Sequence, residues 1–151
     1  MNLGDEWRTP KWLYAYAIAR FGPFDTDACS TPENALCARR FEDALVADWG
    51  RAAAGRVWCN PPYSKPLQSQ VIDRALQAED LDAVFLVPAT TDTRYFFNLV
   101  NRARTVIFLK GRVAFLDHEG RPVKGTRFAS ALIHVAPGGG KPAVEFRDIR
   151  P

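Results

Sequence analysis

Cysteine and histidine are scarce in this chain, and their spacing suits neither disulfides nor a metal site. The sequence has three cysteines, Cys29, Cys37 and Cys59, and two histidines, His118 and His134. An odd number of cysteines without a C-x-x-C pair does not form a disulfide framework. Structural zinc sites show closely spaced ligand pairs, which these residues do not form. We therefore expect reduced structural thiols and no metal site.

Long apolar runs are also missing. No stretch approaches the ~20 residues that span a bilayer. The first residues, MNLGDEWRTPK, lack the charged-then-apolar pattern of a secretory signal. These absences predict a cytoplasmic protein without a membrane partner. The formal net charge of +3 allows an acidic partner without requiring one, because a nucleic-acid surface depends on where Lys and Arg cluster.

The composition that is present, 47% hydrophobic and 25% charged residues, is typical of a globular protein. We expect one domain over residues 1–151, since a chain of this size buries a real core. Near the start, Thr9 has the residue type of an N-cap and Pro10 that of a first helical position. The apolar spacing that follows predicts a helix that ends at Gly22.

Strand-like and helix-like segments alternate along the rest of the chain. Thr31 and Pro32 repeat the helix-start signal and predict a second helix. Apolar spacing predicts further helices over residues 66–79 and 93–103. Strand-like runs cover residues 22–29, 56–60, 81–89, 105–115, 130–136 and 143–149. This order predicts an α/β fold of three layers, with a mostly parallel sheet and an antiparallel edge strand.

The segment RVWCNPPYSKP contains the most informative residues of the sequence. In open α/β sheets, ligands bind beyond the carboxyl ends of the strands, where Asn60, Pro61, Pro62 and Tyr63 follow the apolar run. The two prolines fix their own backbone and favour a rigid extended loop. This loop is expected to point towards the crevice.

The chemistry of these four residues fits a planar ring that bears an amino group. The side-chain oxygen of Asn60 and the carbonyl of Pro61 are two neighbouring acceptors, which suit the two hydrogens of an amine. Tyr63 would offer an exposed aromatic face for stacking, and a nucleobase is the obvious ligand. Accepting both hydrogens makes the amino nitrogen a better nucleophile. Cys59 lies inside the strand, so it is a poor nucleophile.

NPPY resembles the catalytic signature of amino-group methyltransferases that use S-adenosylmethionine. The chain as a whole resembles the phage-type DNA N6-adenine methyltransferase (Dam) family. The matching segments run in order over nearly the whole length: DEWRTPKWL, FDTDACSTPENALC, DWG, VWCNPPYS, FLVPATTDTRYF and FLKGRVAF followed by RFASALIHV. The resemblance implies a Rossmann-like methyltransferase fold and assigns catalysis to Asn60, Pro61, Pro62 and Tyr63.

The resemblance also implies a set of residues that bind S-adenosylmethionine. They are the W-x-TP segment, the acid at the end of the first strand with its two neighbours, and a downstream carboxylate: Trp7, Thr9, Pro10, Asp27, Ala28, Cys29, and Asp43 or Asp48. Of the last two, Asp48 is preferred. The chain departs from the wider methyltransferase pattern because no Gly-x-Gly follows the first strand. Alternatively, Thr9 only starts a helix and Asp27 only caps a strand end.

For the DNA partner, cationic side chains fall in loops near the predicted catalytic edge and suit phosphate contacts. These are Lys65, Arg112, Lys124, Arg127 and, less clearly, Arg121. Phe128 resembles the family's late aromatic position, which contacts the flipped base, and simple burial is its alternative. Only the polar segment 116–128 is free to read bases, which predicts a short recognition site or low specificity.

The sequence therefore predicts methyl transfer from S-adenosylmethionine to N6 of adenine in DNA, with the target base flipped out of the duplex. Two alternatives stay open at this point. The same four residues serve methyltransferases that act on cytosine N4, on an RNA base or on a protein glutamine. A domain that binds nucleic acid or the cofactor without activity is the other. Nothing in the sequence assigns an oligomeric state.

Overall fold

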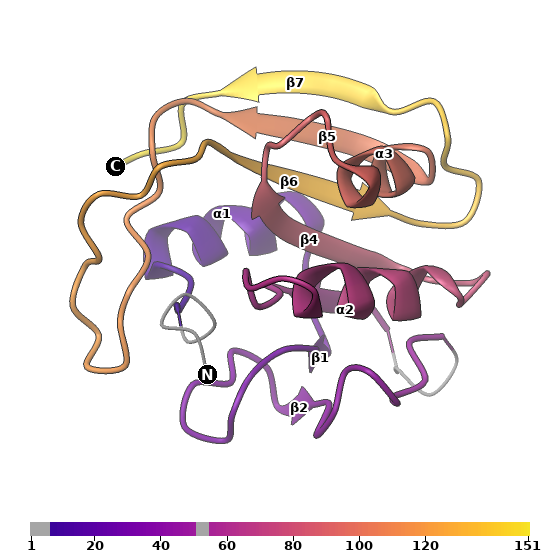
Figure 1. Ribbon diagram of the computed structural model, residues 1–151, viewed down its shortest axis with the longest axis horizontal. Helices are drawn as coiled ribbons and strands as arrows, with labels where there is room; N and C mark the ends of the chain where they lie inside the picture. Colours follow the sequence, from indigo (N-terminus) through magenta and orange to yellow (C-terminus); the bar gives the residue numbers. More distant parts are fainter. Residues whose placement is uncertain (1–6, 51–54) are drawn as a thin grey trace.

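The computed structural model describes residues 7–50 and 55–151 of the chain (Figure 1). In these ranges a 7-stranded sheet has the order β2-β1-β3-β4-β6-β5-β7. The strands are β1 (Thr26–Asp27), β2 (Arg39–Arg40), β3 (Val57–Cys59), β4 (Ala83–Pro88), β5 (Ala103–Leu109), β6 (Ser130–Val135) and β7 (Ala143–Arg147). The helices are α1 (Lys11–Phe21), α2 (Leu67–Leu76) and α3 (Arg94–Val100).

Side chains of the central strands enter two cores, one on each face of the sheet. On β4, Val84 and Leu86 belong to the core that includes α1, whereas Phe85 and Val87 belong to the core with α2 and α3. Figure 1 shows α1 on one face of the sheet and the other two helices on the opposite face. A strand buried on both faces needs cover on both. This arrangement confirms the three-layer α/β class.

The sheet is mostly parallel, as predicted, but the antiparallel strand does not lie at its edge. Strand β6 pairs antiparallel with both β4 and β5, so it lies inside the sheet. It is buried along its whole length, and such a strand is stabilised best between two neighbours. The partly exposed strand β7 takes the edge instead and runs parallel to β5. The predicted edge location was therefore wrong.

Helix α1 agrees with the sequence prediction except at its first residues. The N-cap is Pro10, and no side chain caps the helix, so the predicted capping role of Thr9 was wrong. Gly22 ends the helix as predicted, and its N–H donates to the carbonyl of Ile18 at 2.8 Å. A Cβ atom at Gly22 would lie 2.6 Å from that oxygen. The close approach therefore requires glycine.

The helix predicted from Thr31 does not form. The side-chain oxygen of Asn34 accepts the backbone N–H of Thr31 at 2.8 Å, and the carboxylate of Asp27 accepts the N–H of Leu36 at 3.0 Å. In a helix that started at Thr31, the N–H of Leu36 would bond within the helix, but here Asp27 accepts it, and the segment makes turns that lead into β2.

The remaining elements follow the sequence closely. Helices α2 and α3 and strands β3, β4, β6 and β7 lie within the predicted segments. The strand predicted over residues 105–115 starts at Ala103 and stops at Leu109, two residues before Gly111, which has φ of 79°. Residues 116–128 form a loop without helix or strand, as expected. Among the described residues, no helix has the length and apolar character needed to cross a membrane.

Candidate active site

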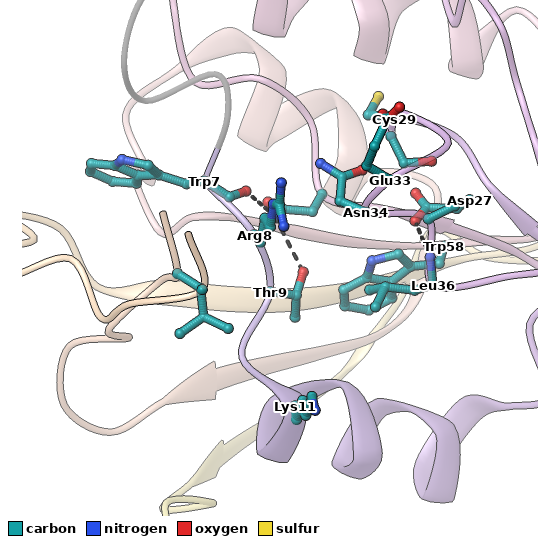
Figure 2. Close-up of a pocket in the computed structure, with 15 residues that line it drawn as sticks. Trp7, Arg8, Thr9, Lys11, Asp27, Cys29, Glu33, Asn34, Leu36 and Trp58 are labelled. Carbon is teal, nitrogen blue, oxygen red and sulfur yellow. Dashed lines mark hydrogen bonds between the residues drawn. The ribbon is translucent and has the colours of Figure 1, made fainter. Parts of the chain in front are cut away.

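The carboxyl ends of β1, β3 and β4 open onto one edge of the sheet, because the three strands are parallel neighbours. A cavity of about 310 Å³ lies at this edge. Residues from four parts of the chain line it: Trp7, Arg8, Thr9 and Lys11; Asp27, Cys29, Ser30, Glu33, Asn34, Ala35 and Leu36; Trp58 and Asn60; and Leu116 and Gly120 of the long loop over residues 116–128. Figure 2 shows Arg8 and Thr9 of the segment before α1 together with Glu33 and Asn34 of the loop after β1.

The side-chain amide of Asn60 is held from both ends. Its nitrogen donates to the carbonyl of Trp7 at 3.1 Å and to the hydroxyl of Thr9 at 3.3 Å. Its oxygen accepts the hydroxyl of Tyr63 at 2.9 Å. An amide oxygen has two lone pairs, so one acceptor position of this cavity-lining residue has no partner among the described residues. The amide therefore has one fixed orientation before any ligand arrives.

Tyr63 lies differently from the sequence expectation. Its ring is half-buried and meets the rings of Trp7, Phe115 and Phe128 edge to face, with interplanar angles of 89°, 83° and 88°. Its hydroxyl reaches the amide oxygen of Asn60 and the carbonyl of Leu86. Burial raises the pKa of Tyr63 well above its ordinary value. Tyr63 is thus a neutral donor within an aromatic cluster rather than an exposed stacking face.

The flat aromatic faces at this edge belong to other residues. Trp7 stacks against Phe115 at 5.6 Å and against Phe128 at 6.2 Å. Phe115 is fully buried, whereas Trp7 and Phe128 are half-buried. Nothing in the local sequence around Phe115 indicates that it joins this cluster. Its place depends on the loop after β5 folding back, where Leu116 pairs with Arg8.

Asp27 lies at the end of β1 and is only 3% exposed. Its carboxylate lines the cavity and accepts the N–H of Leu36. Burial raises the pKa of Asp27, and this hydrogen bond opposes the rise. Trp7, Thr9 and Cys29, three other predicted cofactor residues, also line the cavity. Pro10 is buried at the start of α1 and does not.

A second cavity of about 370 Å³ adjoins the first, and the two share Cys29, Ser30 and Asn34 in their linings. Ala28 and Pro62, both predicted site residues, line the second cavity. Phe41, Leu67 and Val71 contribute apolar walls. The two cavities are therefore neighbours at the ends of β1 and β3.

The structure separates the two candidate carboxylates that the sequence could not rank securely. Asp43 lines the second cavity. Asp48, which was preferred, lines neither cavity, and its exposed carboxylate accepts the N–H of Gly50 at 2.9 Å. Trp49 next to it is 2% exposed and stacks on Phe85, as expected of a core residue.

The three cysteines are free thiols, and no disulfide joins them. The sulfur atoms of Cys29 and Cys59 lie 3.9 Å apart. Cys59 is fully buried, and this burial raises the pKa of its thiol. A neutral buried thiol is a poor nucleophile, which supports the exclusion of Cys59 from catalysis.

The predicted phosphate-binding side chains are exposed and lie in loops: Lys65, Arg112, Lys124 and Arg127. Arg112 also donates to the carbonyl of Thr126 at 3.4 Å, which links the segment after β5 to the segment before β6. Arg121 instead pairs with Asp117 and Glu119. Its charge is therefore largely used within the loop.

Sequence reasoning missed several cavity residues, of which Arg8 is the most informative. Its Nε atom is buried and has no hydrogen-bond partner among the described residues, although the side chain lines the first cavity. Lys11, Glu33 and Asn34 line the same cavity. The only signal in the sequence was the position of Arg8 between Trp7 and Thr9. A buried donor without a partner suits a ligand that brings an acceptor.

Comparison with known proteins agrees with this geometry. Residues 1–137 match the family model described as DNA N-6-adenine-methyltransferase (Dam). The chain is 29% identical over 149 residues to the DNA N-6-adenine-methyltransferase of Escherichia phage T1, covering 85% of this chain and 61% of that protein. It is 32% identical over 124 residues to the protein of the same name from Haemophilus phage HP1, covering 76% and 68%. The chain belongs to the DNA N-6-adenine-methyltransferase (Dam) family.

Proposed function

We propose that this chain transfers a methyl group from S-adenosylmethionine to the N6 amino group of adenine in DNA. The observation that carries the proposal is the fixed amide of Asn60, whose oxygen keeps one open acceptor position beside the cavity. Family membership supports the same reaction class. The bacterial cytoplasm, where a phage-derived enzyme would meet DNA, is the location we propose.

The two adjoining cavities suit the two ends of the cofactor. In the first, the unpartnered Nε of Arg8 is a donor for a carboxylate, and the buried carboxylate of Asp27 is an acceptor for an ammonium group. In the second, Phe41, Leu67 and Pro62 offer apolar walls for an adenine ring, and Asp43 offers acceptors for hydroxyl or amino hydrogens. Trp7, Thr9, Ala28 and Cys29 complete these walls. S-adenosylmethionine supplies an electrophilic methyl group when bound.

The residues of the chain then act by orientation and hydrogen bonding. The free lone pair of Asn60 accepts one hydrogen of the adenine amine, and the carbonyl of Pro61 accepts the other. This draws electron density onto the nitrogen and holds it in line for attack, a proximity effect worth several kcal/mol. The hydroxyl of Tyr63 fixes the amide. Stacking is assigned to Trp7 and Phe128, because both rings are half-buried and lie near to parallel, whereas Phe115 is fully buried.

DNA contact is assigned to the exposed cations around this edge. Lys65 follows the NPPY loop, and Lys124 and Arg127 belong to the long loop that carries Phe128. Such side chains neutralise phosphates without reading sequence. Because the loop over residues 116–128 is the segment of this chain that can reach bases, we propose a short recognition site or low specificity.

The test is a methyl-transfer assay with labelled cofactor on adenine-containing duplex DNA and on inosine–cytosine duplexes, in which cytosine carries the only exocyclic amino group. Asn60→Ala should abolish transfer to adenine while cofactor binding stays within a few-fold of the native chain. Asn98→Ala, a substitution on α3 away from this edge, is the matched control and should retain activity. Equal transfer by the Asn60→Ala protein, or transfer to cytosine alone, would overturn the proposal.

A further inference from the structure

Strand β7 leaves one edge of the sheet without a partner among the described residues. It pairs only with β5 and ends the strand order. Figure 1 shows it at the outer edge of the sheet. Its side chains are unusually apolar for such a position, since Val144 is 54% and Phe146 78% exposed. Exposed apolar edge strands are templates for pairing with another strand.

The apolar face of this edge continues a ladder of aromatic rings from the core. Phe96 of α3 is buried and stacks on Phe108 of β5, which in turn stacks on Phe146 at 5.2 Å. Each ring is more exposed than the one before it. The ladder therefore ends in solvent at a ring that has a stacking partner on one side only.

The opposite face of β7 carries charges. Glu145 accepts hydrogen bonds from Arg20 of α1 and from Arg147 two residues further along the strand. Glu145 and Arg147 thus lie side by side on the face towards α1, and Phe146 lies between them on the face towards α3. If a strand with this pattern pairs with the same strand of a second copy, its charged side chains can meet opposite charges and its apolar ring can be covered by another ring.

The backbone shows which residues of β7 can make new bonds. The carbonyl of Arg147 accepts the N–H of Lys110 at 2.8 Å, so the backbone groups of Arg147 point towards β5. In a parallel ladder the residues alternate in direction. The backbone groups of Val144 and Phe146 therefore point outward from the sheet.

We propose that two copies of this chain associate through antiparallel pairing of their β7 strands, with Phe146 opposite Phe146 of the second copy. In this register the outward N–H and carbonyl of each Phe146 bond to the carbonyl and N–H of the other. The two copies are then related by a two-fold axis, and the row of stacked rings continues from one copy into the other. It also sets Glu145 of each copy opposite Arg147 of the other. The pairing is self-complementary, which is why the partner is a second copy.

The neighbouring registers are worse for specific reasons. A register with Glu145 opposite its own copy brings two carboxylates together, and like charges directly opposite each other destabilise a sheet. A register with Val144 opposite its own copy sets Phe146 against Pro142, which has no N–H to donate. Charge and backbone chemistry thus select the same register.

Cysteine cross-linking tests the register. Under mild oxidation, Phe146→Cys should form a disulfide-linked dimer, and Val144→Cys, whose two copies lie far apart along the paired strands, should not. The native chain, with its three cysteines, serves as background. Equal cross-linking of the Val144→Cys protein, or none of the Phe146→Cys protein, would contradict the proposal.

Sedimentation analysis over a range of protein concentrations tests the association itself. The native chain should show a monomer–dimer equilibrium, and Phe146→Lys should shift it to monomer. Phe97→Lys is the matched control, because Phe97 is similarly exposed at 62% but lies on α3. A native chain that stays monomeric throughout, or dimers that persist in the folded Phe146→Lys protein, would refute the pairing. Folding of each variant is checked by circular dichroism.

Discussion

The side-chain nitrogen of Asn60 donates to the hydroxyl of Thr9 at 3.3 Å, although Thr9 precedes β1 in the sequence and Asn60 follows β3. This bond joins the segment before α1 to the loop after β3. It also decides which end of the Asn60 amide meets the cavity, because the nitrogen is occupied and the oxygen keeps a free lone pair. Thr9 is therefore a positioning residue for the amide that the proposed reaction needs.

Thr9→Val tests this role, because valine keeps the shape of threonine but removes the acceptor. Loss of one hydrogen bond of about 1 to 1.4 kcal/mol should lower the methyl-transfer rate about five- to tenfold. Thr9→Ser keeps a hydroxyl and should stay near the native rate. Rates at saturating cofactor and DNA are the measurement. A Thr9→Val protein with the native rate would show that the carbonyl of Trp7 alone orients the amide.

Tyr63→Phe removes the donor to Asn60 while leaving the aromatic cluster in place. We expect a similar loss of about tenfold in rate, since one hydrogen bond to the amide oxygen is lost. Because burial raises the pKa of Tyr63 well above its ordinary value, the phenol should remain a donor at high pH. The native rate should thus show no loss near pH ~10, where exposed tyrosines ionise.

The outcome for Tyr63→Phe is checked with a melting curve, because the hydroxyl also reaches the carbonyl of Leu86. A variant that melts like the native protein but reacts slowly would support the orienting role. An alkaline loss of rate near pH ~10 that disappears in Tyr63→Phe would instead mean that the phenol titrates normally.

Just before the amino end of β4, the carboxylate of Asp82 pairs with Arg56 at 2.7 Å and with the ring of His134 at 2.8 Å. Burial alone would raise the pKa of Asp82, but hydrogen bonds from His134 and Arg56 outweigh it and lower the pKa to about 2. A lowered pKa means that the carboxylate stabilises the fold above its unfolded pKa near ~4. This contribution should be lost as the pH falls from about 4 to about 2.

Asp82→Asn should therefore lower the free energy of unfolding at neutral pH, by about 1 kcal/mol because solvent partly screens the pair. The difference from the native chain should shrink in acid. Denaturant titrations at several pH values measure both effects. Asp73→Asn is the control, since its ion pair with Arg94 is exposed and should contribute little. A constant difference at every pH would argue against the ionised form as the cause.

Much of this fold could be predicted because local patterns agree with it. The continuous apolar run of β4 indicated a strand covered on both faces, and it is buried throughout. The rigid loop after β3 followed from two adjacent prolines. Gly22 marked the end of α1 because the chain passes too close to Ile18 for a side chain.

The failures have tertiary causes that no local pattern carries. The signal at Thr31 was a good helix start, but the N–H of Leu36 is used by Asp27 across the cavity. The stacking partners Trp7 and Phe128 lie far apart in sequence and meet only because the long loop folds back. The unpartnered donor of Arg8 likewise became visible only when burial was known.

Asp27 should show a conflict between stability and binding. Burial raises the pKa of its carboxyl group, so the charged form destabilises the fold. A raised pKa stabilises the folded chain at low pH, and this contribution is lost as the pH rises through the folded value. Asp27→Asn should therefore melt at a higher temperature than the native chain at neutral pH, and the gap should close in acid.

The same substitution should weaken cofactor binding about tenfold or more, because a hydrogen bond to a charged group is worth ~1.5 to 3 kcal/mol. Calorimetric titration with S-adenosylmethionine measures this loss. Asp48→Asn is the matched control and should bind like the native chain, since Asp48 lines neither cavity. The reverse result, with Asp48→Asn impaired and Asp27→Asn unaffected, would move the cofactor away from the end of β1 and take the Asn60 amide out of reach of the methyl group.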